Sequence, residues 1–174
     1  IGVEMGASHI TVVLCNARGT VLFHKQQDWD IQGDPAGTIK LMNLFISEAR
    51  QAEPLRRIIG IGLAAPCPLD STDPKGLSRH ILPAWTGIDV QKVLADEHQV
   101  QVFVDNDANL GALAEAWWGA ARDTTCATYI KVATGVGAGH VINGRLFRGS
   151  TGIAGEIGHT TVAFEGGNKC RCSL

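Results

Sequence analysis

Short apolar runs separated by glycine-containing turns form the same pattern twice along the chain. The first set predicts three strands joined by small turns, at residues 1–5, 9–15 and 20–25. The second set, in which Asn143 and Gly144 give a strong type I′ hairpin signal, predicts strands at residues 126–133, 138–142 and 145–148. The residue identities differ, so the repeat is one of pattern. It predicts two related units, with a boundary near residue 122.

Helical and strand patterns alternate between these two sets. Asp34 followed by Pro35 is a helix-start signal, and apolar residues at helical spacing then continue as far as Pro54. Residues 58–65 are a continuous apolar run, which predicts a buried parallel strand. In the long loop after this strand, Trp85 either lines a pocket or anchors the loop to the core.

The densest group of polar side chains follows a predicted buried strand. A short helix over residues 89–98 leads to the apolar run 102–104, and a helix-forming run occupies 110–118. Two carboxylates and two amides lie in between: Asp105, Asn106, Asp107 and Asn109. A helix cap needs only one such residue. Because ligands bind at the carboxyl ends of strands in open α/β sheets, the segment predicts a ligand site.

Two glycine turns, each after a predicted strand, are candidates for binding phosphate. They comprise residues 6–8 and residues 134–139. Backbone N–H groups in such turns form concavities that bind anions, and glycine allows a phosphate to approach closely. A glycine-rich hairpin turn without a ligand accounts for the second segment equally well, and the first turn is the weaker signal.

A third polar cluster lies near the end of the chain. Glu156 and His159 are three residues apart and are framed by glycines. His159, Cys170 and Cys172 supply three of the four ligands that a structural zinc ion requires. Two solvated thiols and an unrelated histidine account for the same residues equally well.

Composition narrows the class of protein. The 174 residues carry a net charge of −2, which gives no field that attracts nucleic acid or anionic membranes. No apolar run approaches the ~20 residues of a membrane span. Five cysteines, an odd number, fit a reducing cytoplasm better than a disulfide scaffold. Because Ile1 lies inside an apolar run and no complete element precedes Leu174, we expect the chain to be part of a larger protein.

These features, in this order, resemble the ROK family (repressors, open reading frames and sugar kinases). The most specific matches are residues 105–109, the glycines of 135–139, and Gly155-Glu156-Ile157-Gly158-His159 followed by Cys170-x-Cys172. The resemblance covers nearly the whole chain and implies an α/β architecture, the actin-like ATPase (ribonuclease H-like) fold. Residues 1–121 would form the N-terminal domain. Residues 122–174 would begin the second domain and stop within the zinc motif.

The resemblance also implies roles for individual residues. Asp107 would be the general base that takes a proton from a sugar hydroxyl, so that the oxygen attacks the γ-phosphate of Mg-ATP. His159 would contact the sugar with one ring nitrogen and Zn²⁺ with the other, beside Cys170 and Cys172. The sugar-binding residues would be Asn106, Asp107, Glu156 and His159. The phosphate-binding residues would be Gly6, Ser8, Thr134, Gly135 and Gly137.

Departures from the family's kinases favour a regulator. Kinases of the family begin with Asp-x-Gly-Gly-Thr, whereas this chain has Glu4 at the Asp position, Ala7 in place of the second glycine and Ser8 in place of Thr. We therefore expect the sugar-sensing domain of a ROK transcriptional regulator, which binds a monosaccharide. It would reach DNA only through an upstream helix-turn-helix absent from this chain and would form a homodimer or higher oligomer. The alternative is an ATP-dependent hexose kinase with Asp107 as base.

Overall fold

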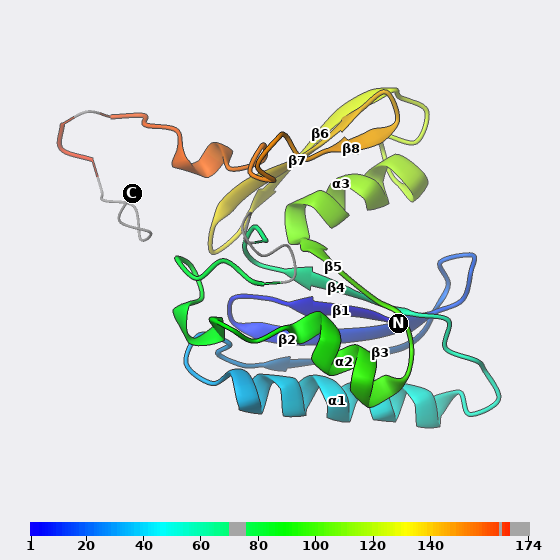
Figure 1. The fold of residues 1–174 in the computed structure, drawn as a ribbon. Coiled ribbons are helices and arrows are strands. Elements are labelled where there is room, and N and C mark those ends of the chain that lie inside the picture. Colours follow the sequence, from blue (N-terminus) through cyan, green and yellow to red (C-terminus); the bar gives the residue numbers. More distant parts are fainter. Residues whose placement is uncertain (70–75, 164, 168–174) are drawn as a thin grey trace. The chain divides into compact units, whose positions relative to one another are not determined.

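The computed structural model describes residues 1–69, 76–163 and 165–167. These residues form two compact units, Ile1–Asn106 and the part of the chain from Asp107 onward. Figure 1 traces the chain through both units. Each unit is a sheet with helices packed on it.

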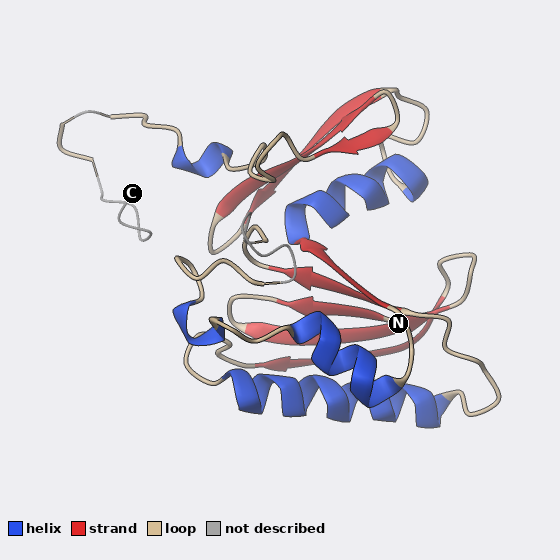
Figure 2. Ribbon diagram, viewed as in Figure 1, coloured by secondary structure: helices blue, strands red, loops and turns tan. Residues whose placement is uncertain are grey.

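The first unit contains a five-stranded mixed sheet (Figure 2). Its strands are β1 (Gly2–Met5), β2 (His9–Cys15), β3 (Val21–Asp28), β4 (Ile61–Ala65) and β5 (Val102–Asn106). Their order across the sheet is β3-β2-β1-β4-β5. Strands β1, β2 and β3 pair antiparallel, whereas β4 pairs parallel with both β1 and β5. The predicted antiparallel set and the predicted parallel strand are confirmed.

The register of the parallel strands aligns their carboxyl ends. Glu4 on β1 lies opposite Ala64 on β4, and Ala64 lies opposite Asp105 on β5. The carboxylates of two different strands are therefore delivered to the same edge of the sheet, where open α/β sheets bind ligands.

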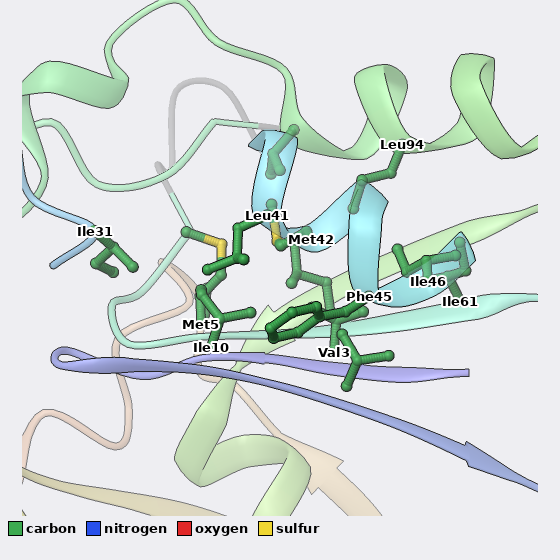
Figure 3. Close-up of a cluster of buried hydrophobic side chains, with 14 of the residues drawn as sticks. Val3, Met5, Ile10, Ile31, Leu41, Met42, Phe45, Ile46, Ile61 and Leu94 are labelled. Atoms are coloured by element: carbon green, nitrogen blue, oxygen red, sulfur yellow. The ribbon is translucent and has the colours of Figure 1, made fainter. Parts of the chain in front are cut away.

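Two helices, α1 (Pro35–Ala52) and α2 (Val90–His98), cover one face of this sheet (Figure 1). The Asp34 side chain accepts a 2.8 Å hydrogen bond from the Gly37 N–H and caps α1 at the predicted position. The apolar stripe of α1 packs against the sheet, as Figure 3 shows for Met42, Phe45 and Ile46. This packing forms the main hydrophobic core of the first unit.

Trp85 anchors the long loop to this core. It ends the short 3₁₀ helix Pro83–Trp85 and is 1% exposed. Its indole N–H donates a 2.8 Å hydrogen bond to the Ile31 carbonyl. A buried indole with a satisfied N–H is a packing residue.

The strand before the polar segment differs from the prediction of a buried strand. β5 is an edge strand, and Val102 is 2% exposed while Phe103 is 61% exposed. Val102 faces the core beneath α1 and α2, whereas Phe103 lies on the opposite face of the sheet, so only one face of the strand is buried. Helix α3 (Asp107–Trp118) also begins directly after β5, at Asp107, and not at residue 110.

The second unit repeats the antiparallel pattern of the first. Its sheet contains three strands, which lie side by side in the order β6 (Cys126–Val132), β7 (Val136–Ile142) and β8 (Arg145–Phe147). Asn143 and Gly144 have φ values of 52° and 70°, as the predicted type I′ turn requires. The repeat of pattern is thereby confirmed.

Helix α3 packs on β6 and β7 and therefore belongs to the second compact unit. The predicted boundary at residue 121 lies after this helix, and as a boundary between domains of the whole protein it stays a prediction. Within the described ranges, no helix is both long and apolar enough to cross a bilayer.

Candidate functional site

Asp107 lies at the start of α3 and forms an ion pair with Lys131 of β6. Its Oδ2 atom is 2.6 Å from the Lys131 Nζ atom, and the two side chains are 13% and 27% exposed. The first turn of a helix presents N–H groups and the positive end of the helix dipole, both of which favour a carboxylate. Asp107 is therefore a largely buried, charged acceptor held by two favourable interactions.

The other polar residues of this segment shape the strand end. The Asp105 Oδ1 atom accepts a 2.8 Å hydrogen bond from the Asn106 N–H, and Asp105 is 9% exposed. Asn109 is 7% exposed and lies in the first turns of α3. Asn106, the last residue of β5, immediately precedes Asp107. The segment thus combines the Asp105 carboxylate, which binds the backbone at the strand end, with the Asp107 carboxylate, which pairs with Lys131.

Glu156 and His159 lie close together in the same unit. The Glu156 Oε2 atom is 3.3 Å from the His159 Nε2 atom, across the short 3₁₀ helix Ile157–His159. Burial raises the pKa of the Glu156 carboxyl; His159 acts to lower it, and the negative charge of Asp107 raises it further. The influence of Asp107 means that the two carboxylates share one electrostatic environment. A cluster of this kind is typical of functional sites.

Two glycines hold the Glu156 segment against strand β7. A Cβ atom at Gly155 would lie 1.8 Å from the Ala138 carbonyl oxygen, and one at Gly158 would lie 2.2 Å from the Val136 carbonyl oxygen. The Ala138 N–H also donates a 2.7 Å hydrogen bond to the Gly155 carbonyl. Glycine is required at both positions because backbone packs directly on backbone.

The second glycine turn is the β6–β7 hairpin. The Ala133 N–H donates a 2.9 Å hydrogen bond to the Gly135 carbonyl, beside Thr134. A Cβ atom at Gly135 would meet nothing within 4 Å, whereas one at Gly139 would lie 2.3 Å from the Ala108 carbonyl oxygen. Gly139 therefore serves the packing of α3 on β7. Thr134, Gly135 and Gly137 lie in or beside the open part of the hairpin, and their phosphate-binding role stays a prediction.

In the first glycine turn, the ring of His9 lies against Gly6. A Cβ atom at Gly6 would be 2.3 Å from the His9 Cε1 atom. The His9 Nε2 atom is 3.5 Å from the Glu4 Oε2 atom. Gly6 is buried and Ser8 is exposed. The imidazole thus covers the glycine that was predicted to approach a phosphate.

Of the three predicted zinc ligands, the structure describes His159 alone. Cys170 and Cys172 lie outside the described residues. Among the described residues, no three His, Cys, Asp or Glu side chains are grouped so that they could hold a metal ion. The zinc site stays a prediction.

No motif of the sequence gives Lys131 a role, although the alternation of side chains along β6 indicates that this lysine is partly buried. Side chains of β6 alternate between exposed and half-buried, and Lys131 falls on the half-buried side with Ala127 and Tyr129. A lysine on an otherwise uncharged, half-buried face needs an anionic partner. The strand pattern could therefore have indicated a paired lysine, but not which carboxylate it meets.

Comparisons with known proteins identify relatives of this chain. A xylose repressor from Caldicellulosiruptor bescii is 32% identical over 174 residues, which cover 99% of this chain and 43% of the repressor. A glucokinase from Halalkalibacterium halodurans is 33% identical, with 99% of this chain and 52% of the glucokinase covered. The chain thus spans about half the length, or less, of these relatives.

A solved structure extends the likeness to three dimensions. A ROK family transcriptional regulator, described as a homologue of the E. coli MLC protein, matches with a TM-score of 0.80 and 27% identity, covering 99% of this chain and 43% of that chain. The sequence profile of the ROK family matches residues 1–174. The chain therefore belongs to the ROK family and has that family's actin-like ATPase fold.

Proposed function

We propose that this chain is the sugar-binding part of a ROK-family transcriptional regulator. The observation that carries the proposal is the charged cluster of the second unit, in which Asp107 pairs with Lys131 and Glu156 pairs with His159. All four residues belong to one compact unit, so the cluster does not depend on how the two units are placed.

The chemistry of the cluster suits a polyhydroxylated ligand. Each sugar hydroxyl donates one hydrogen bond and accepts others. Carboxylate oxygens of Asp107 and Glu156 accept from such hydroxyls, and the carboxamide of Asn106 both donates and accepts. Hydrogen bonds to charged groups contribute about 1.5–3 kcal/mol each, which is enough for specific recognition of a small ligand.

Features of the first glycine turn favour a regulator over a kinase. The His9 ring covers Gly6, Ala7 replaces a glycine, and Glu4 faces His9 at 3.5 Å. A phosphate needs open backbone N–H groups at such a turn. The similarity to a xylose repressor and to the solved ROK regulator supports the same conclusion. DNA would be bound by a helix-turn-helix that precedes Ile1, and a homodimer or higher oligomer would present two such domains.

A hexose kinase is the second candidate. Asp107 at the start of α3 and the open hairpin at Gly135 are the observations that favour it, together with the similarity to a glucokinase. In that mechanism Asp107 would accept a proton from a sugar hydroxyl, and Mg-ATP phosphates would bind Thr134, Gly135 and Gly137. Glu4, Ala7 and His9 all oppose it at the first turn.

We also propose that Zn²⁺ binds His159 together with Cys170 and Cys172. This arrangement would couple a structural metal to the orientation of the sugar-binding histidine. Metal analysis of the full-length protein tests it: stoichiometric zinc that is lost in Cys170→Ser supports the site, and a zinc content unchanged by that substitution contradicts it.

The deciding experiment compares two activities of the full-length protein. One assay follows phosphate transfer from Mg-ATP to a panel of pentoses, hexoses and N-acetylhexosamines. The other measures affinity for DNA from the upstream region of its own gene, with and without each sugar. The proposal predicts no phosphate transfer and at least a tenfold change in DNA affinity with one sugar. Phosphate transfer that Asp107→Asn abolishes, with no effect of sugar on DNA binding, would establish the kinase instead.

A further inference from the structure

Lys131 reaches Asp107 because of its position in strand β6. Ala127, Tyr129 and Lys131 alternate with exposed residues and share the half-buried face of the strand. A Cβ atom at Gly111 of α3 would lie 2.6 Å from the Tyr129 ring, so this is the face on which α3 packs. Lys131, two residues after Tyr129, therefore meets the first residue of α3.

The ion pair is close and sheltered from water. The Lys131 Nζ atom lies 2.6 Å from the Asp107 Oδ2 atom, and the Asp107 side chain is only 13% exposed. Gly137 lies opposite Lys131 in the β6–β7 register. Because Gly137 carries no side chain, strand β7 places no bulk beside the pair. The contact at Oδ2 restrains rotation of the Asp107 carboxylate.

Lys131 also supplies the counter-charge of Asp107. If Lys131 were removed, a largely buried carboxylate would lose its counter-charge, which is costly in a site with little water.

We propose that Lys131 is a positioning residue of the sugar site: it holds the Asp107 carboxylate so that Oδ1 accepts a hydrogen bond from a sugar hydroxyl. This inference rests on the proposed function, because it gives Asp107 a sugar to bind. It also bears on the type of activity. A general base must take up a proton, and Asp107 could do so only by weakening its pair with Lys131. Lys131 therefore favours recognition of the sugar over proton transfer.

The test measures sugar affinity of the full-length protein by calorimetry, with the same panel of pentoses, hexoses and N-acetylhexosamines. Lys131→Met is expected to weaken binding of the recognised sugar at least tenfold, and Lys131→Arg to recover most of that loss. The matched control is Lys25→Met, because Lys25 forms a comparable 2.5 Å ion pair with Glu48 in the first unit. That control is expected to leave sugar affinity within twofold of the wild type.

A double-mutant cycle with Asp107→Asn separates positioning from a general structural effect. If Lys131 acts through Asp107, Lys131→Met changes affinity by less than about twofold in the Asp107→Asn background. An equal loss in both backgrounds would overturn the inference. If Lys131→Met does not fold, Lys131→Gln takes its place in the cycle.

The same experiment distinguishes failure of this inference from failure of the proposed function. Sugar binding that is lost in Asp107→Asn but kept in Lys131→Met overturns the role of Lys131 alone. Absence of binding by the wild-type protein to every sugar of the panel overturns the proposed function, and the role of Lys131 with it.

Discussion

Substituting Gly155 by alanine tests how the sugar-binding residues are held in place. The added Cβ atom would lie 1.8 Å from the Ala138 carbonyl oxygen and 2.8 Å from the Ala138 carbonyl carbon. Ordinary van der Waals contact begins at 3.4 Å. Both neighbouring atoms are backbone atoms of a paired strand, so neither can rotate away as a side chain would. The segment that carries Glu156 must therefore move off strand β7.

The expected loss of stability has two parts. Forcing a methyl group into a filled space costs about 1–3 kcal/mol. Movement of the segment also breaks the 2.7 Å hydrogen bond from the Ala138 N–H to the Gly155 carbonyl, at a net cost of about 1 kcal/mol. We expect Gly155→Ala to lower the free energy of unfolding by about 2–4 kcal/mol. Sugar affinity should fall at least tenfold, because Glu156 and His159 move with the segment.

Thermal unfolding and sugar titration of the full-length protein measure both effects. Gly135→Ala is the matched control, because a Cβ atom there meets nothing within 4 Å and the residue has no positive φ. The control should unfold within about 0.5 kcal/mol of the wild type. Wild-type stability and sugar affinity in Gly155→Ala would refute the packing argument. An equal loss of stability in Gly155→Ala and Gly135→Ala would show that the loss does not depend on the close contact at Gly155.

Two further predictions concern stability of the first unit. Asp34→Ala removes the cap of α1 and should destabilise the protein by about 1 kcal/mol in urea unfolding; no change would show that the cap is dispensable. Burial, and then the charge of Arg50, lower the pKa of His98 below its usual value of about 6.5. The unfolded chain therefore binds this proton more readily, so the contribution of His98 to stability is present above pH 6.5 and is lost as the pH falls through the lowered pKa. Wild-type protein should lose more stability than His98→Gln between pH 7 and pH 5, and parallel losses would contradict this.

Most of the architecture could be predicted because it depends on local patterns. Each strand of the two antiparallel sets has its own apolar run and turn residues, and Asn143 with Gly144 specifies its hairpin almost alone. The start of α3 was missed by three residues, because Asp107 resembles a helix cap and yet begins the helix. The exposure of Phe103 could not be predicted, because an apolar run does not encode which face of the sheet the helices cover.

The candidate site could be predicted as a set of residues but not as a set of contacts. Asp107, Glu156 and His159 were identified by residue type and spacing. Their partners were not: the pair of Lys131 with Asp107 joins residues 24 positions apart, through the packing of α3 on β6. The position of the His9 ring over Gly6 likewise depends on a side-chain rotamer, and no sequence pattern specifies it.

Calorimetric titration of the full-length protein shows whether the Asp107–Glu156 cluster binds a monosaccharide. Wild-type protein, Asp107→Asn and Glu156→Gln are titrated with each sugar of the panel in the absence of nucleotide. We expect one sugar to bind the wild type and each substitution to weaken that binding by about 10–100-fold, because each removes a hydrogen bond to a charged group. Binding of no sugar by the wild type, or equal affinity in all three proteins, would contradict this expectation.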